Sequence, residues 1–401
     1  MLLAALLGIV LGVVAGLLPG LHPNTMIPLM LVVAAWFDPL TAAVVLVTTG
    51  VVNSFVSFIP AILLGAPDDA EAMSILPGHS LMLSGRGYEA IKLTVMGGVG
   101  ATALSLVLLP VMWVAFPAIY SLTRPWLHVL LTAVVLYMVL TEQGMRGKFW
   151  AALTFTLAGL LGLLALDGFG DGALFPLLTG LFGLPMLLLS LRSGVVPPSS
   201  ISYESDPMST GRAATGMTIG ALSGVLVGLL PGIGSSQAAV LAQEAIGRDS
   251  DKPAAQRTFL LAIGGVAMAD VIYSMLALWL VGNPRSGISV AVEQLVTPTP
   301  ALLWVLLAVV TFAAGAGAYI TIRLARTILP LLHRINYRRL NTVVIAFLVL
   351  LVSVFTGISG LLVMTVAAAI GLVPNLTGIR RSHSMGCLLL PTILFFAGLA
   401  T

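Results

Sequence analysis

Long apolar runs separated by short polar loops dominate the chain. Examples are 40–66, 91–120, 258–281 and 301–322. A helix of about 20 apolar residues crosses a hydrocarbon core of about 30 Å, so each of these runs is long enough to span a membrane. The pattern predicts an all-α polytopic membrane protein. The alternative, a β-barrel, is disfavoured because it needs short segments of alternating polarity.

An apolar motif that ends in Pro-Gly occurs once in each half of the chain. Residues 8–20 read GIVLGVVAGLLPG and residues 220–232 read GALSGVLVGLLPG, and eight of these positions are identical. Paired interrupted apolar segments at matching places in two halves are the best sequence indication of a transporter's binding site.

The similarity between the halves extends beyond this motif. Asn53 falls opposite Asp270, and Gly144 falls opposite Gly357. We therefore predict two homologous halves, 1–191 and 213–401. A cytoplasmic linker rich in Pro and Ser, 192–212, joins them.

Each half is predicted to contain one re-entrant hairpin, at 1–36 and 214–246, followed by five spans. The hairpin arms of about 12–18 residues rise about 18–27 Å, less than a full crossing. The predicted spans are 40–66, 91–119, 127–141, 149–166 and 173–191, then 258–281, 301–322, 342–356, 361–374 and 386–400. Because a hairpin returns to its side of entry and five spans reverse sides, the two halves should have opposite orientations.

The basic residues agree with this inverted topology. One set of loops holds sixteen of the eighteen Lys and Arg residues: Arg86, Lys92, Arg146, Lys148, Arg192, Arg212, Arg248, Lys252, Arg257, Arg323, Arg326, Arg334, Arg338, Arg339, Arg380 and Arg381. The other side receives only Arg124 and Arg285. Cytoplasmic loops carry the excess of basic residues, so we place the protein in the cell membrane with both termini outside.

Composition excludes several classes of function. The chain is 59% hydrophobic and 8% charged, with a mean hydropathy of +1.09, far from a soluble domain with about 25% charged residues. Its net charge of +3 is explained by topology, so no nucleic-acid partner is expected. The single cysteine, Cys387, excludes an internal disulfide, and we expect neither a metal site nor a cofactor. Walker, HExxH and GxSxG motifs are absent from the sequence, which argues against ATP-driven transport and the familiar hydrolases.

The two Pro-Gly breaks are the predicted substrate site. Each break is followed by good helix N-caps, so free N–H groups and a positive dipole end should face the break and attract an anion. The predicted substrate-binding residues are Pro19, Gly20, His22, Asn24, Thr25, Pro231, Gly232, Gly234, Ser235, Ser236 and Gln237. The alternative is that the motif only allows close helix packing.

Asp270 is the one acidic residue deep within a predicted span. Intramembrane carboxylates are costly and mark ion or proton paths by default, so we expect Na⁺ or H⁺ as a coupling ion. The predicted ion-coupling residues are Asn53, Ser54, Ser57, Asp270, Tyr273 and Ser274. The alternative role for Asp270 is a buried polar contact between helices.

The segments GVVAGLLPGLHPNTMIPLM and GVLVGLLPGIGSSQAAVLA resemble the two signature regions of the TctA family, the large membrane subunit of tripartite tricarboxylate transporters. This resemblance covers nearly the whole chain and rests on Gly16, Pro19 and Gly20 and on their second-half counterparts at 228–234. It implies secondary uptake of carboxylates with a small membrane subunit and an extracytoplasmic binding protein. The first motif departs from the family in having His22 and Pro23. The chain is similar to the compact, archaeal-type branch, and the alternative is that it transports without partner subunits.

Three functions remain open at this stage. The leading hypothesis is an ion-coupled carboxylate transporter, for which a homodimer is one possible assembly. A translocase for polyprenyl-phosphate lipid carriers is the second, although the predicted site offers only His22 as a cationic residue. An intramembrane enzyme using Asp270 or His22 is the third, and it lacks a second acid–base partner at a recognisable spacing.

Overall fold

A computed structural model describes residues 1–18, 36–64, 75–169, 173–193, 202–203, 207–229, 235–246, 252–282, 286–297, 299–332 and 337–399. These residues form helices and loops, with no strand among them. The all-α prediction is therefore confirmed over the described part of the chain.

The helices follow the order that the apolar runs predict. The first half contains α1 (Leu2–Leu17), α3 (Pro39–Val56), α4 (Phe58–Leu64), α5 (Ile75–Leu83), α6 (Gly87–Thr123), η2 (Arg124–Trp126), α7 (Leu127–Leu140), α8 (Gly144–Phe169), α9 (Leu174–Leu178), η4 (Thr179–Gly183) and α10 (Leu184–Ser193). The second half contains α11 (Thr210–Leu229), α12 (Ser235–Ile246), α13 (Lys252–Val281), α14 (Gly287–Leu295), α15 (Pro300–Leu332), α16 (Tyr337–Thr377), η5 (Arg381–Met385) and α17 (Gly386–Phe396).

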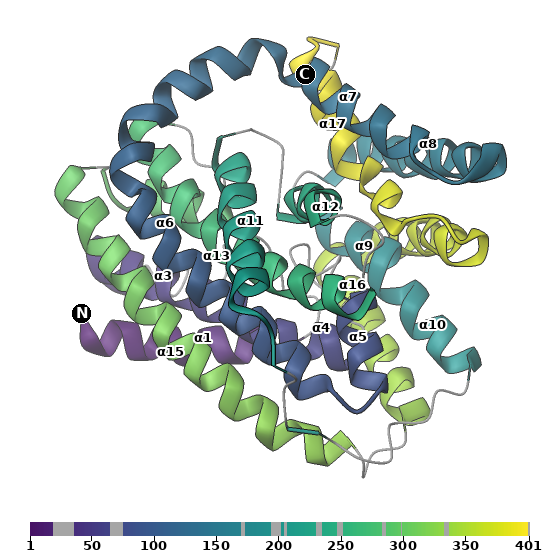
Figure 1. Cartoon of the computed structure of the whole chain (residues 1–401), viewed down its shortest axis with the longest axis horizontal. Helices are drawn as coiled ribbons and strands as arrows, with labels where there is room; N and C mark the ends of the chain where they lie inside the picture. The colour runs from purple at the N-terminus through teal and green to yellow at the C-terminus, as the bar shows by residue number, and fades with distance from the viewer. Residues whose placement is uncertain are drawn as a thin grey trace.

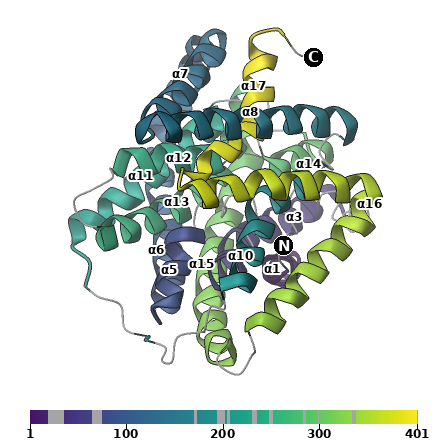
Figure 2. The ribbon, with the colours of Figure 1, turned by 90° about the vertical axis from the view of Figure 1, so that its right-hand side faces the viewer.

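Two groups of helices make up the molecule, and each half of the sequence contributes to both (Figure 1). In the first group, α13 packs against α6 and α11, while α3 packs against α1 and α15. In the second group, α8 packs against α16 and α17, and α10 packs against α16 (Figure 2). The long helix α6 leads through η2 into the second group.

Seven helical stretches among the described residues are long and apolar enough to cross a membrane, compared with ten predicted spans. Part of the difference is helical continuity: α6, η2 and α7 form one stretch from Gly87 to Leu140, and α16 joins the predicted spans 342–356 and 361–374. The helix from Leu174 to Leu189 is shorter than a span. Helix α11 has 20 residues, longer than the predicted arm, and is one of the seven stretches, while the re-entrant course of the hairpins stays a prediction. Its first residues, from Thr210, extend the helix into the segment that we assigned to the linker.

The glycines of the repeated motif bring helices together in the same way in both halves. A Cβ on Gly12 of α1 would lie 2.8 Å from the Val52 Cβ of α3, and one on Gly224 of α11 would lie 2.2 Å from the Ala269 Cβ of α13. One turn further on, Gly16 meets Val56 and Gly228 meets Tyr273. The partners Val52 and Ala269 are themselves matched positions of the predicted repeat. The two motifs thus pack against equivalent positions on equivalent helices.

The directions of these helices follow from their contacts. Gly8, Gly12 and Gly16 meet α3 at successively later positions, so α1 and α3 run parallel, and the same holds for α11 and α13. Helices α6 and α13 also run parallel, because their starts are joined by the ion pair between Glu89 and Arg257. Helix α6 runs antiparallel to α3, since its start lies beside Leu63 near the end of α4. The α1–α3 pair therefore runs opposite to the α11–α13 pair.

A pair of glycines that the sequence matches also has matching backbone conformations. Gly144 begins α8 with φ of +67°, and Gly357 interrupts α16 with φ of +68°. This left-handed region is accessible to glycine at little steric cost. The chain therefore turns at equivalent points in the two halves.

Candidate functional site

The predicted tip residues fall mostly outside the described part of the structure. Pro19, Gly20, His22, Asn24 and Thr25 lie outside the described residues. Pro231, Gly232 and Gly234 do so as well, whereas Ser235, Ser236 and Gln237 form the first turn of α12. What the structure describes is therefore the surroundings of the second break.

Asp270 joins the start of α12 to the middle of α13. The Ser235 hydroxyl donates a hydrogen bond of 2.9 Å to Oδ2 of Asp270, and the Ser274 hydroxyl donates one of 2.7 Å to Oδ1. Ser235 is the first residue of α12, so the carboxylate lies close to the positive end of that helix dipole. The sequence placed Ser235 in the substrate set and Asp270 in the ion set, and the structure brings the two together.

Asn53 and Asp270 have different surroundings, although a residue near each of them in the sequence approaches Gly98 of α6. A Cβ on Gly98 would lie 2.7 Å from Phe55 Cε1 and 3.1 Å from Met268 Cγ. Phe55 and Met268 are each two residues from Asn53 and Asp270. The Asn53 side chain is 3% exposed, and its Oδ1 has no hydrogen-bond partner in the structure. A buried amide oxygen of this kind can still accept a bond from a ligand or a donor on a shifted helix.

Of the other predicted ion-coupling residues, Tyr273 lies on the same helix as Asp270, and Ser54 and Ser57 lie near Asn53 in the chain. Tyr273 is fully buried against Gly228, and neither its hydroxyl nor the nearby Ser105 hydroxyl makes a hydrogen bond of ordinary geometry. Ser57 is buried next to Gly16, while the Ser54 hydroxyl donates to the Gly50 carbonyl of its own helix at 3.0 Å. The Ser54 hydroxyl is thus hydrogen-bonded within its own helix, as hydroxyls in apolar helices often are.

The region around Asp270 gathers oxygen atoms from two helices. One carboxylate and two hydroxyl groups converge from α12 and α13, and these are oxygen ligands suited to Na⁺ or groups able to relay H⁺. Among the described residues, no group of three or more His, Cys, Asp or Glu side chains could hold a metal ion.

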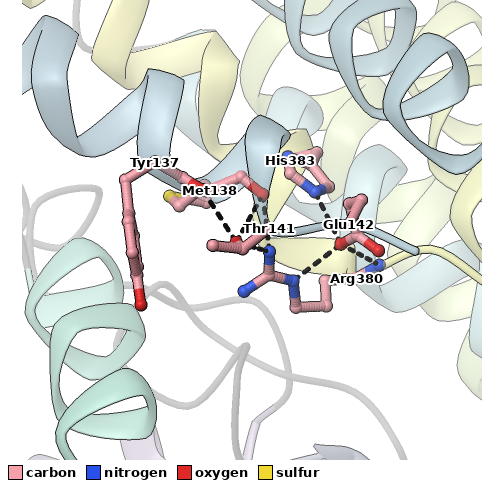
Figure 3. Close-up of polar contacts among 6 residues, drawn as sticks. All are labelled: Tyr137, Met138, Thr141, Glu142, Arg380 and His383. Carbon is pink, nitrogen blue, oxygen red and sulfur yellow. Dashed lines mark hydrogen bonds and ion pairs between the residues drawn. The ribbon is translucent and has the colours of Figure 1, made fainter. Parts of the chain in front are cut away.

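A second polar cluster, which sequence reasoning missed, connects the two halves (Figure 3). Oε1 of Glu142 accepts hydrogen bonds from Arg380 Nε at 2.6 Å and from His383 Nε2 at 2.9 Å. The Arg380 guanidinium also donates to the Met138 carbonyl at 2.5 Å and to the Thr141 hydroxyl at 2.7 Å. Arg380 therefore neutralises the carboxylate and caps the C-terminal end of α7.

The electrostatics of Glu142 follow from these contacts. Burial alone raises the pKa of the carboxyl, but the hydrogen bonds from Arg380 and His383 and the charge of Arg380 outweigh burial and hold that pKa below its ordinary value. Next to this cluster, burial lowers the pKa of Arg381 to about 10.

A third cluster lies where α6 and α13 begin. Glu89 is 1% exposed and forms ion pairs with Arg86 at 2.5 Å and with Arg257 at 2.9 Å. Arg86 and Arg257, like Arg380 in the second cluster, belong to the basic set that we assigned to membrane topology alone. Glu89 lies in the same loop as Arg86, which could have identified that pair, whereas Arg257 and Arg380 lie in other loops than the glutamates they contact.

Comparisons with known proteins agree with the resemblance in the sequence. The model of the tripartite tricarboxylate transporter TctA family matches residues 2–386. An uncharacterized protein of Methanocaldococcus jannaschii is 27% identical over 409 residues, which cover 98% of each chain. No solved structure matches this chain.

Proposed function

Because this chain belongs to the tripartite tricarboxylate transporter TctA family, we propose that it is a secondary transporter that couples movement of small carboxylates to Na⁺ or H⁺. The family is one of transporter components, and the apolar helices make the chain a multi-pass membrane protein. The observation that carries the finer proposal is the Asp270 carboxylate, bonded to the first residue of the helix that follows a Pro-Gly break.

An inverted repeat of two hairpins and ten spans is the arrangement we propose for the whole chain. Its support is the repeated glycine packing of α1 on α3 and of α11 on α13, together with the opposite directions of these two pairs. In such a fold the two breaks approach the membrane midplane from opposite sides. A carboxylate substrate would then be held between the helix N-termini that follow the breaks.

The charge of Asp270 supplies a physical reason for coupling. An anionic substrate beside an ionised carboxylate is repelled, and this repulsion is strong where the effective dielectric constant is low. A cation or proton at Asp270 removes the repulsion, so substrate and cation bind better together than separately. Reciprocal coupling of this kind is what ion-driven transport requires.

The alternative functions have less support. A polyprenyl phosphate would be repelled by the Asp270 carboxylate just as a carboxylate substrate would, and the family whose model matches the chain is one of tricarboxylate transporters. An intramembrane enzyme would need a second acid–base group beside Asp270, and neither of the two hydroxyls that bond it, those of Ser235 and Ser274, is such a group.

The remaining features of the proposal follow from the family and the charge pattern. A small membrane subunit and an extracytoplasmic binding protein would deliver the substrate, unless this chain acts alone. We place it in the cell membrane with both termini outside, since basic residues gather in one set of loops.

Thermal unfolding of the purified protein with added ligands tests the function. We expect citrate or a related di- or tricarboxylate to raise Tm in a concentration-dependent way, because a ligand that binds only the folded state stabilises it. Stabilisation by polyprenyl phosphate, with none by any carboxylate, would favour the lipid-carrier translocase and contradict the proposal.

A further inference from the structure

A groove of about 460 Å³ lies between the two groups of helices, away from Asp270. Its lining residues are Trp126, Val129, Leu130, Ala133, Val134, Tyr137 and Met138 on one side and Leu241 on the other. The first seven follow helical spacing, so they form one continuous face of η2 and α7. Leu241 lies on α12, the helix whose first residue bonds Asp270.

We propose that this groove binds one hydrocarbon chain of an anionic membrane phospholipid. The groove residues are aliphatic except for Met138 and for Trp126 and Tyr137, which lie toward opposite ends of α7. The groove is open, since Trp126, Val129 and Tyr137 are 65%, 50% and 53% exposed, so an apolar chain can enter it from the side. Because one wall comes from α7 and the other from α12, the site is concave, unlike an ordinary lipid-facing helix surface.

The length of the groove fits a single lipid tail. Met138 comes twelve positions after Trp126, which corresponds to about 18 Å of helix. One leaflet of a hydrocarbon core about 30 Å thick measures about 15 Å. Helix α7 also lies within an apolar stretch that could cross the membrane. A tail from one leaflet can therefore occupy the groove over nearly its full length.

The charges at the end of the groove near Met138 complement an anionic headgroup. The Met138 carbonyl accepts from Arg380, and the next helix, α8, carries Arg146 and Lys148 in its first turns. Glu142 is the carboxylate paired with Arg380 there, so the local charge remains positive. Arg124 is the basic residue next to Trp126 at the other end. Basic pockets at the cytoplasmic side of membrane helices suit anionic phospholipid headgroups.

The position of the groove gives the lipid a structural role. Leu241 of α12 lies opposite α7. Helix α12 also contacts η5, which carries His383 of the Glu142 cluster. A lipid tail between α7 and α12 would fill the space between the two groups of helices and support α12.

Native mass spectrometry of the detergent-purified protein tests the proposal. We expect the protein to retain one dioleoyl phosphatidylglycerol and to retain dioleoyl phosphatidylcholine several-fold less. Ala133→Trp fills the groove and should lower retention of phosphatidylglycerol about tenfold, the effect of about 1.4 kcal/mol. Leu136→Trp, at an exposed α7 position outside the groove, is the matched control and should retain lipid like the wild type.

Two further variants keep the test decisive. Leu241→Trp fills the groove from α12, so it serves if Ala133→Trp does not fold. Arg146→Gln should reduce retention of phosphatidylglycerol but leave that of phosphatidylcholine unchanged. The proposal is overturned if the wild type retains no lipid, if both lipids are retained equally, or if the groove variants retain phosphatidylglycerol like the wild type. It is also overturned if a small membrane protein co-purifies and Ala133→Trp displaces it.

Discussion

The α1–α3 and α11–α13 pairs have the same packing and different charges. In both pairs, glycines of the repeated motif contact equivalent residues on the neighbouring helix. At one matched position in these neighbours stands the neutral Asn53, and at the other stands Asp270, which accepts two hydroxyl hydrogen bonds. The comparison indicates that similar helix packing occurs twice, while the carboxylate that we propose for coupling stands at one of the two matched positions.

The largest effect should come from filling the close contacts that the two pairs share. A Cβ on Gly12 or Gly224 already lies less than 3 Å from atoms of the neighbouring helix, so Gly12→Val and Gly224→Val should each destabilise the protein by about 3 kcal/mol or more. Tm and the yield of monodisperse protein measure this effect. Gly211→Ala, at a position of α11 with open space around it, is the control and should leave Tm nearly unchanged. A normal Tm for Gly224→Val would contradict the packing of α11 on α13.

Removing the charge of Asp270 should break the asymmetry between the pairs without unfolding the protein. Asp270→Asn is nearly isosteric and makes the position resemble Asn53, so the purified variant should insert and fold. In liposomes its carboxylate uptake should lose dependence on Na⁺ or pH. Wild-type uptake with unchanged ion dependence would mean that Asp270 has a structural role only.

The hydroxyl partners of Asp270 should have a smaller effect than the carboxylate. Ser235→Ala and Ser274→Ala each remove one hydrogen bond to a charged group, worth about 1.5–3 kcal/mol. We therefore expect about a tenfold or greater change in the cation concentration that gives half-maximal uptake. Ser54→Ala is the matched control, because the Ser54 hydroxyl bonds its own helix. Equal effects of all three substitutions would show that the Asp270 contacts have no special role.

The smallest effect on stability should come from the Glu142 cluster, which joins the two halves away from the α1–α3 and α11–α13 pairs. A carboxyl with a lowered pKa stabilises the folded state above its unfolded pKa, and this contribution is lost as pH falls through the folded pKa. Glu142→Gln should therefore lower Tm at neutral pH. The difference in Tm between the variant and the wild type should shrink when the pH falls below 4.5, the ordinary pKa of a glutamate. Glu293→Gln, at an exposed position of α14, is the control. A pH-independent difference for Glu142→Gln would contradict the charge-based explanation.

Much of the fold follows from sequence because periodic apolar runs and small residues have direct structural consequences. The helices and the match of Gly144 with Gly357 were accessible in this way, and the close packing of the motif glycines was the alternative to a substrate site. Span boundaries were less accessible, since α6, η2 and α7 continue through a region where we expected a loop.

The site was predictable only in part. The intramembrane position of Asp270 identified it, and its neighbour Ser274 follows one helical turn later. The bonds of Arg380 and His383 to Glu142 join residues more than 200 positions apart, so they depend on tertiary packing that local patterns do not encode.

Calorimetric titration of the purified protein with citrate, at low and high Na⁺ and at two pH values, tests the central claim most directly. If a cation at Asp270 accompanies the substrate, citrate affinity should rise with Na⁺ or with H⁺, and citrate should raise the affinity for that cation by the same factor. Asp270→Asn should abolish this dependence. Citrate affinity that is independent of both Na⁺ and pH in the wild-type protein would contradict the account.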